Sequence, residues 1–256
     1  RYRGTFSVGD QMDFSVEQSY FELWQKHYDA TCPPKDWLAA SGALAGSLSE
    51  VFMAGYQTAM RCRFGIDDSA WAAFCVSEGA DGLPPVVQDD AGLLTGVKTW
   101  VAAASVVTSF WVKVGRGSES FYVVLPRETK GLSLTLNRNK GFLPELSVGR
   151  LHLEKVESPA PQGVSKLALK QFPKLEASCI LIASLGYFAS QGYTWASDAL
   201  ARHSAPVIDE RSDAALVALA LDVQTWIKTA PELSARVPGW DRDRRLIEMY
   251  LGMILK

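Results

Sequence analysis

The residue pattern of the chain changes twice along its 256 residues, from helical to strand-like and back to helical. Residues 70–158 carry short segments rich in Val, Trp, Phe and Tyr, whereas the residues on either side follow helical patterns. Segments of this length and composition are typical of strands. Their regular spacing favours a small antiparallel barrel or sandwich over a parallel sheet with crossover helices. We therefore expect a multidomain α and β protein in the order helices, β unit, helices.

This order predicts three domains. We expect a short N-terminal helical domain over 1–69, a middle β domain over 70–160, and a short C-terminal helical bundle over 161–256. Strands are expected in the middle domain at Trp71–Ser77, Leu93–Ala103, Phe110–Val114, Phe121–Leu125, Leu132–Leu136 and Leu151–Val156. A Gly-x-Gly at 115–117 lies between two of these segments, which indicates a hairpin turn and not a phosphate loop, since no helix follows it.

The flanking parts carry the helical patterns. Ser15 is a reasonable N-cap for the first helix, with Gln18 three residues later as in a capping box. A second helix is expected from Lys35 to about Cys62, and three of its glycines permit close approach of a neighbouring helix: Gly42, Gly46 and Gly55. The C-terminal patterns are Val164 to about Leu200 (one helix or two, bent near Pro173), Asp209–Thr229 capped by Asp209 or Ser212, and Trp240–Leu255. The acids and arginines of residues 241–245 indicate a solvated helix start.

Composition excludes several classes of protein. A net charge of −2 lacks the excess of Lys and Arg that a nucleic-acid-binding face needs. Four cysteines without C-x-x-C spacing indicate buried thiols in a reducing compartment, which favours the cytoplasm. Three histidines without H-E-x-x-H predict no metal site. No window of bilayer length is free of charge and turn residues, so no membrane span is expected, and the apolar run 177–189 indicates a buried helix.

Trp100 is the aromatic residue with the most distinctive surroundings. A Trp in a strand is usually part of a core. Here Lys98 and Thr99 precede it, and three alanines follow at 102–104. A bulky aromatic side chain beside small residues also suits a flat ring system, which stacks on the indole while the small side chains leave room for it.

Four segments carry a resemblance to the acyl-CoA dehydrogenase family. Residues 74–83 read F-C-V-S-E-G-A-D-G-L and are similar to the family's Y-x-V-T-E-P-G-A-G-S-D. Residues 96–102 read G-V-K-T-W-V-A and resemble G-x-K-x-W-I-T. Residues 149–156 are similar to the last strand of the family's middle domain, and residues 242–252 resemble its R-D-x-x-x-x-x-I-Y-E-G.

The resemblance implies a fold of helical domain, β domain and helical bundle, with FAD bound between the last two. It implies the α,β-dehydrogenation of an acyl-CoA or acyl-carrier thioester, in which a glutamate removes the α-proton and the flavin accepts the β-hydride. It also implies a homo- or hetero-oligomer that associates through the last domain, where residues 214–227 are long and apolar enough for a dimer face. The implied cofactor-contacting positions are Phe74, Val76, Ser77, Gly82, Trp100 and Ala102.

The chain departs from the family pattern at several of these positions. Ser77 replaces the usual Thr and keeps a hydroxyl donor, but Ala102 replaces a Thr and loses one. Leu83 stands where the family has the Ser of a Gly-Ser pair. The family's R-x-x-F-G and Q-x-x-G-G segments, which contact FAD, have no counterpart, and residues 198–212 stand where the arginine is expected. Phosphate binding without that arginine is weaker.

The catalytic base is the largest departure. In the common subgroup a glutamate follows Ile-Tyr, where this chain has Leu251. Other subgroups place the glutamate early in the first helix of the last domain, and here Glu176 lies about one turn after residues 171–173. Glu248, about one turn before Leu251, is a second candidate.

Three hypotheses for function follow. The first is an FAD-dependent dehydrogenase with a displaced base. The second is a non-catalytic subunit of the same fold that has lost the base and the flavin. The third is an acyl-thioester-binding module without redox chemistry. Fold alone does not decide among them.

Overall fold

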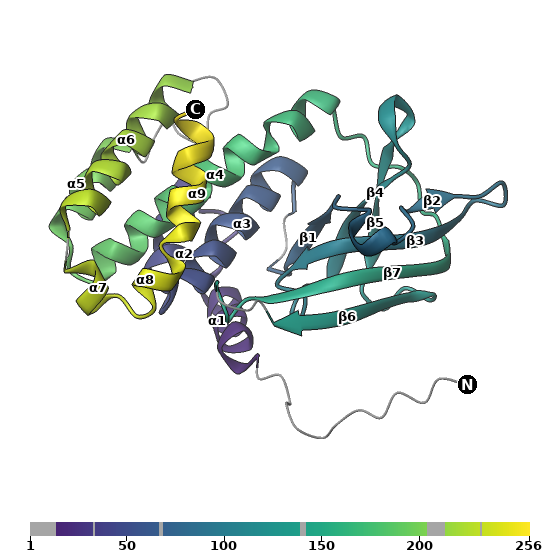
Figure 1. Cartoon of the computed structure of the whole chain (residues 1–256), viewed down its shortest axis with the longest axis horizontal. Helices are drawn as coiled ribbons and strands as arrows, with labels where there is room; N and C mark the ends of the chain where they lie inside the picture. Colours follow the sequence, from purple (N-terminus) through teal and green to yellow (C-terminus); the bar gives the residue numbers. More distant parts are fainter. Residues whose placement is uncertain (1–13, 33, 67–68, 139–141, 204–212, 231) are drawn as a thin grey trace.

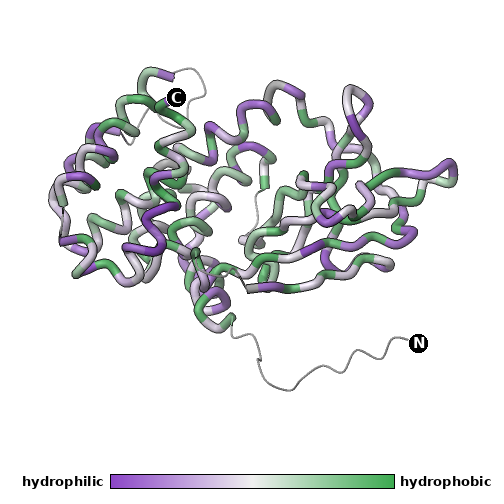
Figure 2. The backbone as a smooth tube through the Cα atoms, in the orientation of Figure 1, coloured by the Kyte–Doolittle hydropathy of each residue, from purple (hydrophilic) through white to green (hydrophobic). Residues whose placement is uncertain are grey.

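The computed structural model describes residues 14–256 except 33, 67–68, 139–141, 204–212 and 231. Within these residues the order of elements is helices, strands, helices, as the sequence predicts (Figure 1). The N-terminal helices are α1 (Ser15–His27), α2 (Pro34–Ala43) and α3 (Leu48–Phe64). Hydrophobic and hydrophilic positions alternate along several helices and strands (Figure 2), whereas α3 is buried on all sides from Leu48 to Arg61.

The N-terminal helices correct two expectations. Ser15 is not the N-cap of α1, because Phe14 occupies that position and makes no side-chain capping hydrogen bond. The single helix expected from Lys35 to Cys62 is two helices, α2 and α3. Ser47 lies between them as the N-cap of α3 and accepts a hydrogen bond from Glu50 N at 3.4 Å. The Glu50 carboxylate in turn accepts from Gly46 N, so this reciprocal capping starts a new helix where periodicity alone suggests continuation.

The strands form two open sheets. One sheet has the order β1 (Ala72–Cys75), β4 (Ser109–Val114), β5 (Phe121–Pro126). The other has the order β2 (Val87–Gln88), β3 (Leu93–Ala102), β7 (Ser147–Glu157), β6 (Leu132–Arg138). Two short 3₁₀ turns, η1 (Ala80–Gly82) and η2 (Gly117–Glu119), lie between strands, and η2 forms the expected hairpin turn between β4 and β5.

The expected antiparallel barrel or sandwich is not confirmed, since neither sheet closes on itself among the described strands. β1 pairs with β4 in parallel, with Phe74 opposite Trp111, while the other pairings are antiparallel. The parallel pair is possible because β2, β3 and a long connection separate the two strands along the chain. Gly96 adopts a φ of +140°, and a Cβ there would clash with the Pro85 carbonyl, so β3 passes against the backbone of residues 85–86.

Helix α1 is attached to the β unit by a buried carboxylate. Glu17 accepts hydrogen bonds from the backbone N–H of Ser147 at 3.0 Å and from the hydroxyls of Ser147 and Ser105. Burial raises the pKa of Glu17, and these hydrogen bonds oppose that shift. The contact joins the first helix to the start of β7 and so fixes the N-terminal helices against the sheets.

Helices α2, α3 and α4 (Lys166–Ser190) pack with close backbone approach. A Cβ on Gly55 would lie 2.6 Å from Ile180, and one on Gly42 would clash with the carbonyl of Ala183. The expectation that these two glycines admit a neighbouring helix is confirmed, and that helix is α4. Gly186 of α4 makes the reciprocal approach to Ala39. Gly46 lies instead in the connection between α2 and α3.

Helix α4 is the central helix of the molecule. Its segment Leu169–Ser190 is long and apolar enough to cross a membrane by length and composition, which differs from the sequence expectation. However, 78% of its apolar window is buried inside the structure, as the prediction of a buried helix over 177–189 requires. It crosses the helical half, and its first turn reaches the β unit (Figure 1). α4 is therefore a core helix that connects the two halves.

The remaining helices are α5 (Thr194–His203), α6 (Asp213–Thr229), α7 (Leu233–Arg236), α8 (Trp240–Asp243) and α9 (Arg245–Ile254). The long pattern from Val164 is two helices, separated where Gly192 adopts a φ of +85°. Pro173 lies inside α4, and the proposed caps Asp209 and Ser212 lie outside the described residues. The expectation of a solvated helix start near 241–245 is wrong at Asp243. This residue is buried, and its carboxylate accepts a 2.9 Å hydrogen bond from Leu143 N.

Candidate active site

Glu176 is a half-buried residue of α4 whose carboxylate faces the last helix. It lies in the first half of α4. The hydroxyl of Tyr250 from α9 donates a 3.0 Å hydrogen bond to its Oε1. Burial raises the pKa of Glu176 to about 7, although this hydrogen bond lowers it. A carboxyl with a pKa near neutrality takes up and releases a proton readily, which suits a general base.

Tyr56 of α3 lies on another side of Glu176. The pKa of the Tyr56 hydroxyl is raised by burial and, to a lesser degree, by the negative charge of Glu176. Its oxygen accepts a 2.7 Å hydrogen bond from Phe74 N at β1. The ring of Phe172, one turn before Glu176 on α4, lies 6.4 Å from that of Tyr56 and 5.0 Å from that of Phe74. Helices α3 and α4 and strand β1 therefore converge beside Glu176.

A row of aromatic rings continues from Tyr56 to Trp100 on β3. Phe52 stacks on Tyr56, with ring centroids 5.5 Å apart and an interplanar angle of 12°. The same Phe52 meets Trp100 edge-on at 6.5 Å. The structure thus brings Phe74 and Trp100, expected on sequence grounds to contact one cofactor, against the same turn of α3. It places Glu176 at the other end of this row.

Trp100 and Val76 form an exposed apolar platform at the end of the row. Their exposed fractions are 38% and 36%, which is high for large apolar residues. Ser77 beside Val76 is also exposed. Ala102 lies in the core with no exposed surface, so its side chain can contribute only by being small. Val76, Ser77 and Trp100 are thus exposed side chains on two segments that the backbone hydrogen bond from Thr99 N to Ser77 O holds side by side.

A buried ion pair holds the two halves of this platform together. Lys98, with no exposed surface, pairs with Glu78, whose Oε1 also accepts a 3.1 Å hydrogen bond from Val86 N. Thr99 N donates to Ser77 O at 2.9 Å. Burial lowers the pKa of Lys98, and Glu78 opposes that shift. These contacts tie residues 76–78 to residues 98–100 across the gap between the two sheets.

Gly82 lies in the surface turn η1. Its φ is +70°, and a Cβ there would meet nothing within 4 Å. Asp81 in the same turn also has a positive φ of 56° and pairs with Arg150 of β7. The turn is therefore open on its outer side, and the ion pair fixes it to β7.

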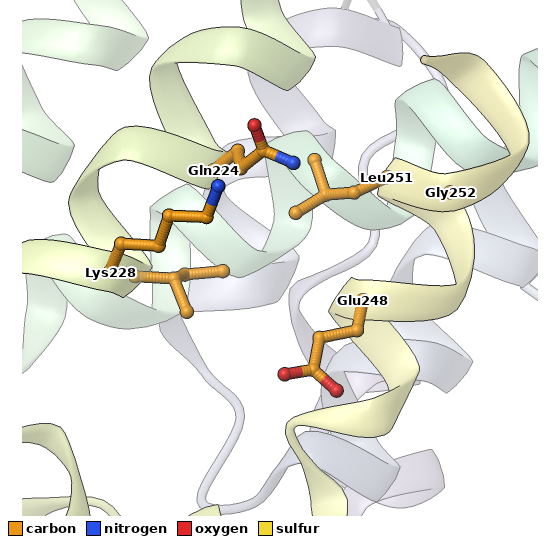
Figure 3. Close-up of a pocket in the computed structure, with 6 residues that line it drawn as sticks. Gln224, Lys228, Glu248, Leu251 and Gly252 are labelled. Carbon is orange, nitrogen blue, oxygen red and sulfur yellow. The ribbon is translucent and has the colours of Figure 1, made fainter. Parts of the chain in front are cut away.

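Glu248, the second candidate base, points elsewhere. It is exposed, it pairs with Arg244 at 3.5 Å, and it lines a hollow of about 180 Å³ between α6 and α9 (Figure 3). It is two residues before Tyr250, so the two side chains leave α9 about 200° apart. Leu251, which occupies the common base position, is only 4% exposed and lines the same hollow. Glu248 and Glu176 therefore belong to different sides of α9.

The platform fits the ring end of a flavin, since Trp100 presents an exposed indole and Ser77 a hydroxyl beside it. The part of the chain expected to reach the other end of FAD overlaps residues outside the described set. Among the described residues, no group of three or more His, Cys, Asp or Glu side chains is placed to hold a metal ion.

Sequence reasoning missed the partners of Glu176. Tyr250 belongs to the segment that resembles I-Y-E-G, and its position directly before Leu251 is a signal that the segment still faces the candidate site. Phe52 and Tyr56 are four residues apart on one helix face, but nothing in the sequence says which strand they meet. The Lys98–Glu78 ion pair joins the two motif segments. The sequence shows one residue of each charge, but it does not show that they pair.

The sequence and the fold were compared with those of known proteins. No family model and no curated protein matches the sequence. Solved structures do match. The structure titled FkbI for biosynthesis of a methoxymalonyl extender unit has a TM-score of 0.63 at 16% identity, over 93% of this chain and 91% of that one. The prolyl acyl carrier protein oxidase AnaB has a TM-score of 0.57 at 13% identity, over 87% of each chain.

A glutaryl-CoA dehydrogenase from Mycobacterium smegmatis, in complex with FADH2, has a TM-score of 0.51 at 13% identity, over 96% of this chain and 90% of that one. These identities establish the fold alone. The chain therefore has an acyl-CoA dehydrogenase-like fold, as the two motif segments predict.

Proposed function

We propose that the protein is an FAD-dependent dehydrogenase of acyl thioesters, with Glu176 as the base that removes the α-proton. The observation that carries the proposal is the position of Glu176: a half-buried carboxylate with a pKa of about 7, joined by a row of aromatic rings to the exposed Trp100 platform. The solved structures of the same fold support it, since their titles include an FAD-dependent dehydrogenase, a glutaryl-CoA dehydrogenase in complex with FADH2 and a prolyl acyl carrier protein oxidase.

Glu176 is suited to this role because its surroundings set its protonation. Burial disfavours the carboxylate and makes it a stronger base than a solvated glutamate. Tyr250 donates to the carboxylate, which both orients it and keeps part of the population ionised near neutral pH. The rings of Tyr56 and Phe172 pack edge to face beside Glu176, which lowers the polarity of its surroundings.

The cofactor-binding residues are proposed at the platform. Trp100 and Val76 hold the flavin ring by contact, and the Ser77 hydroxyl donates to it. Phe74 supports them from β1, Ala102 leaves room behind the indole, and the open turn at Gly82 admits the phosphate end. When bound, FAD supplies the hydride acceptor for the β-carbon. Lys98 and Glu78 keep the two sides of the platform in register.

Turnover of an acyl thioester with an artificial electron acceptor tests the assignment of the base. Glu176→Gln is expected to abolish turnover while FAD remains bound, because the amide keeps the shape but cannot accept the proton. Glu248→Gln, on the other side of α9, is the matched control and is expected to retain activity. Unchanged turnover in Glu176→Gln, or loss of turnover in Glu248→Gln alone, contradicts the assignment.

Leu251 favours a second function. At the base position of the common subgroup stands an aliphatic side chain packed against α6. A subunit that has lost its base and flavin, or that binds acyl thioesters without oxidising them, needs no carboxylate there. On this alternative the purified chain takes up no FAD, and a longer partner of the same fold carries the chemistry.

An oligomer in the cytoplasm is part of the proposal. Helix α6 exposes Val217 and Leu221 on one face, which supports residues 214–227 as a contact between subunits. All four cysteines are free thiols, and burial raises the pKa of Cys62 to about 11 and that of Cys75 to about 12, as expected for unreactive thiols in a reducing compartment. A sedimentation experiment that shows only monomer contradicts the oligomer.

A further inference from the structure

Strand β6 forms an open edge of its sheet. It is the outermost strand of the four-stranded sheet and pairs on one side only, with β7. It lies along the lower border of the β unit (Figure 1). Among the described residues no strand pairs with its other side, so a row of backbone N–H and C=O groups is left for another segment to bind.

The other sheet edges are covered or short. On β1, the side chain of Gln57 bonds both backbone groups of Ala72, at 2.9 and 3.1 Å. On β5, Gln162 N donates to Tyr122 O at 2.8 Å, and β2 has only two residues. β6 has seven residues and contains neither Pro nor Lys, which protect many natural edge strands. Within the part of the chain that the structure describes, β6 is therefore the long edge strand without a covering contact.

The leucines of β6 are only partly covered. Leu132, Leu134 and Leu136 face the core and are half-buried. Leu151 and Leu153, opposite them on β7, are 0% and 3% exposed, because β7 has a strand on both sides. The residues between the β6 leucines are polar and exposed: Ser133, Thr135 and Asn137. A strand that continues this row therefore needs apolar side chains at alternate positions on one face and polar side chains on the other.

The first residues of the chain carry this pattern in their sequence. Residues 1–8 read R-Y-R-G-T-F-S-V and lie outside the described residues. If they are extended, Tyr2, Phe6 and Val8 share one face, with the small Gly4 between them. The opposite face is polar: Arg1, Arg3, Thr5 and Ser7. A Gly-Asp pair typical of turns follows, and alternation bounded by a turn signal predicts a half-buried strand.

This segment joins the described structure beside the end of β6. Phe14 precedes α1, and Glu17 in the first turn of α1 accepts a 3.0 Å hydrogen bond from Ser147 N. Ser147 stands opposite Arg138, the last residue of β6. The link from Val8 to Phe14 spans up to about 20 Å when extended, and β6 itself is about 20 Å long. The segment can therefore reach the whole edge, and it runs toward the same end as β6, which makes the pairing parallel.

We propose that residues 2–8 add to the free side of β6 as a parallel strand. Phe6 and Val8 continue the row of β6 leucines, and Thr5 and Ser7 face solvent. The occupant of the edge is thus the chain's own N-terminal segment. The added strand gives the backbone groups of β6 partners, covers its leucines and blocks edge-to-edge pairing with a second copy. This pairing is independent of the proposed chemistry.

Hydrogen exchange of the full chain, measured by mass spectrometry on peptides that contain residues 132–138, tests the pairing. The double variant Phe6→Asp with Val8→Asp puts charges on the face that meets the leucines. Its β6 amides are expected to exchange about tenfold faster than those of the wild type. The matched control, Thr5→Asp with Ser7→Asp, adds the same charges at the same spacing to the solvent face. It is expected to change the exchange rate less than about twofold.

Two further measurements guard against a simple loss of folding. Peptides from α4 are expected to exchange equally in all variants, which shows that the core is intact. Deletion of residues 1–8 removes the strand without adding charge and is expected to give the same acceleration of about tenfold at β6.

Three results overturn the inference. The first is equal exchange of β6 in the wild type and both double variants, and the second is equal acceleration in the two double variants. The third is protection of β6 that the deletion leaves unchanged. Protection that falls on dilution, together with a dimer in sedimentation, assigns the edge to a second copy and also contradicts the inference.

Discussion

Tyr250 of α9 donates its hydroxyl hydrogen bond to Glu176 of α4 across 74 residues of sequence. This contact joins the segment that resembles the family's I-Y-E-G to the first helix of the last domain. The two places where members of the fold keep their base are thus neighbours in space. Under the proposed function, a carboxylate on α4 would replace one on α9 without moving the reaction centre far, with Tyr250 as the partner of the relocated base.

The first prediction concerns this hydrogen bond. Tyr250→Phe removes a donor that lowers the pKa of Glu176, so the pKa is expected to rise further above its present value of about 7. Because the base must be ionised, the acid limb of the kcat/KM profile moves to higher pH, by about one to two pH units for a hydrogen bond to a charged group. Tyr193→Phe is the matched control, since the buried Tyr193 hydroxyl has no hydrogen-bond partner among the residues that the structure describes. An unmoved acid limb in Tyr250→Phe contradicts the account.

The second prediction is a dependence of stability on pH. A carboxyl whose pKa is higher in the folded state than in the unfolded chain stabilises the fold below its unfolded pKa of about 4.5, and this contribution is lost as the pH rises through about 7. The shift corresponds to about 3 kcal/mol. Urea denaturation at pH 5 and pH 8 is expected to show a smaller loss of stability for Glu176→Gln than for the wild type. Equal losses show that Glu176 is an ordinary solvated carboxyl.

The third prediction concerns the buried ion pair under the platform. Lys98→Met leaves the Glu78 carboxylate without its cation, which costs about 3–5 kcal/mol when a buried pair is broken. FAD affinity is expected to fall as well, because Ser77 and Trp100 lose their common support. Lys174→Ala breaks an exposed pair with Asp213 and is expected to cost less than about 1 kcal/mol. Thermal melts and FAD titrations measure both effects, and an unchanged FAD affinity in a folded Lys98→Met protein counts against the platform.

The fourth prediction concerns the packing of α4. Gly55→Val places a side chain where a Cβ lies 2.6 Å from Ile180, so α3 and α4 must separate, and a cost of about 3 kcal/mol or more is expected. Gly252→Ala, in a helix with nothing within 4 Å of the new Cβ, is expected to gain about 0.5–1 kcal/mol. A comparison of the two free energies of unfolding tests the packing, and a tolerated Gly55→Val shows that the helices do not touch there.

The strand positions could be predicted because the residue pattern reports them directly. Each expected segment from Trp71–Ser77 to Leu151–Val156 overlaps a strand, and only the two-residue strand β2 was not expected. The parallel pairing of β1 with β4 could not, since it depends on which strands lie side by side after a long connection. The break between α2 and α3 was missed for a local reason: Ser47 and Glu50 form a reciprocal cap inside an otherwise helical pattern.

The candidate site was predictable in its parts but not in its assembly. The resemblance placed Trp100 and Ser77 on the platform and offered both Glu176 and Glu248 as bases. What separates the two glutamates is burial and the direction of one helix face, and both arise from packing.

The visible absorption spectrum of the purified protein, recorded before and after addition of FAD and then of an acyl thioester, tests the central claim most directly. The account predicts a bound flavin band that bleaches when the thioester is added in the absence of an electron acceptor, and that does not bleach in Glu176→Gln. A protein that binds no flavin even with FAD in excess contradicts it.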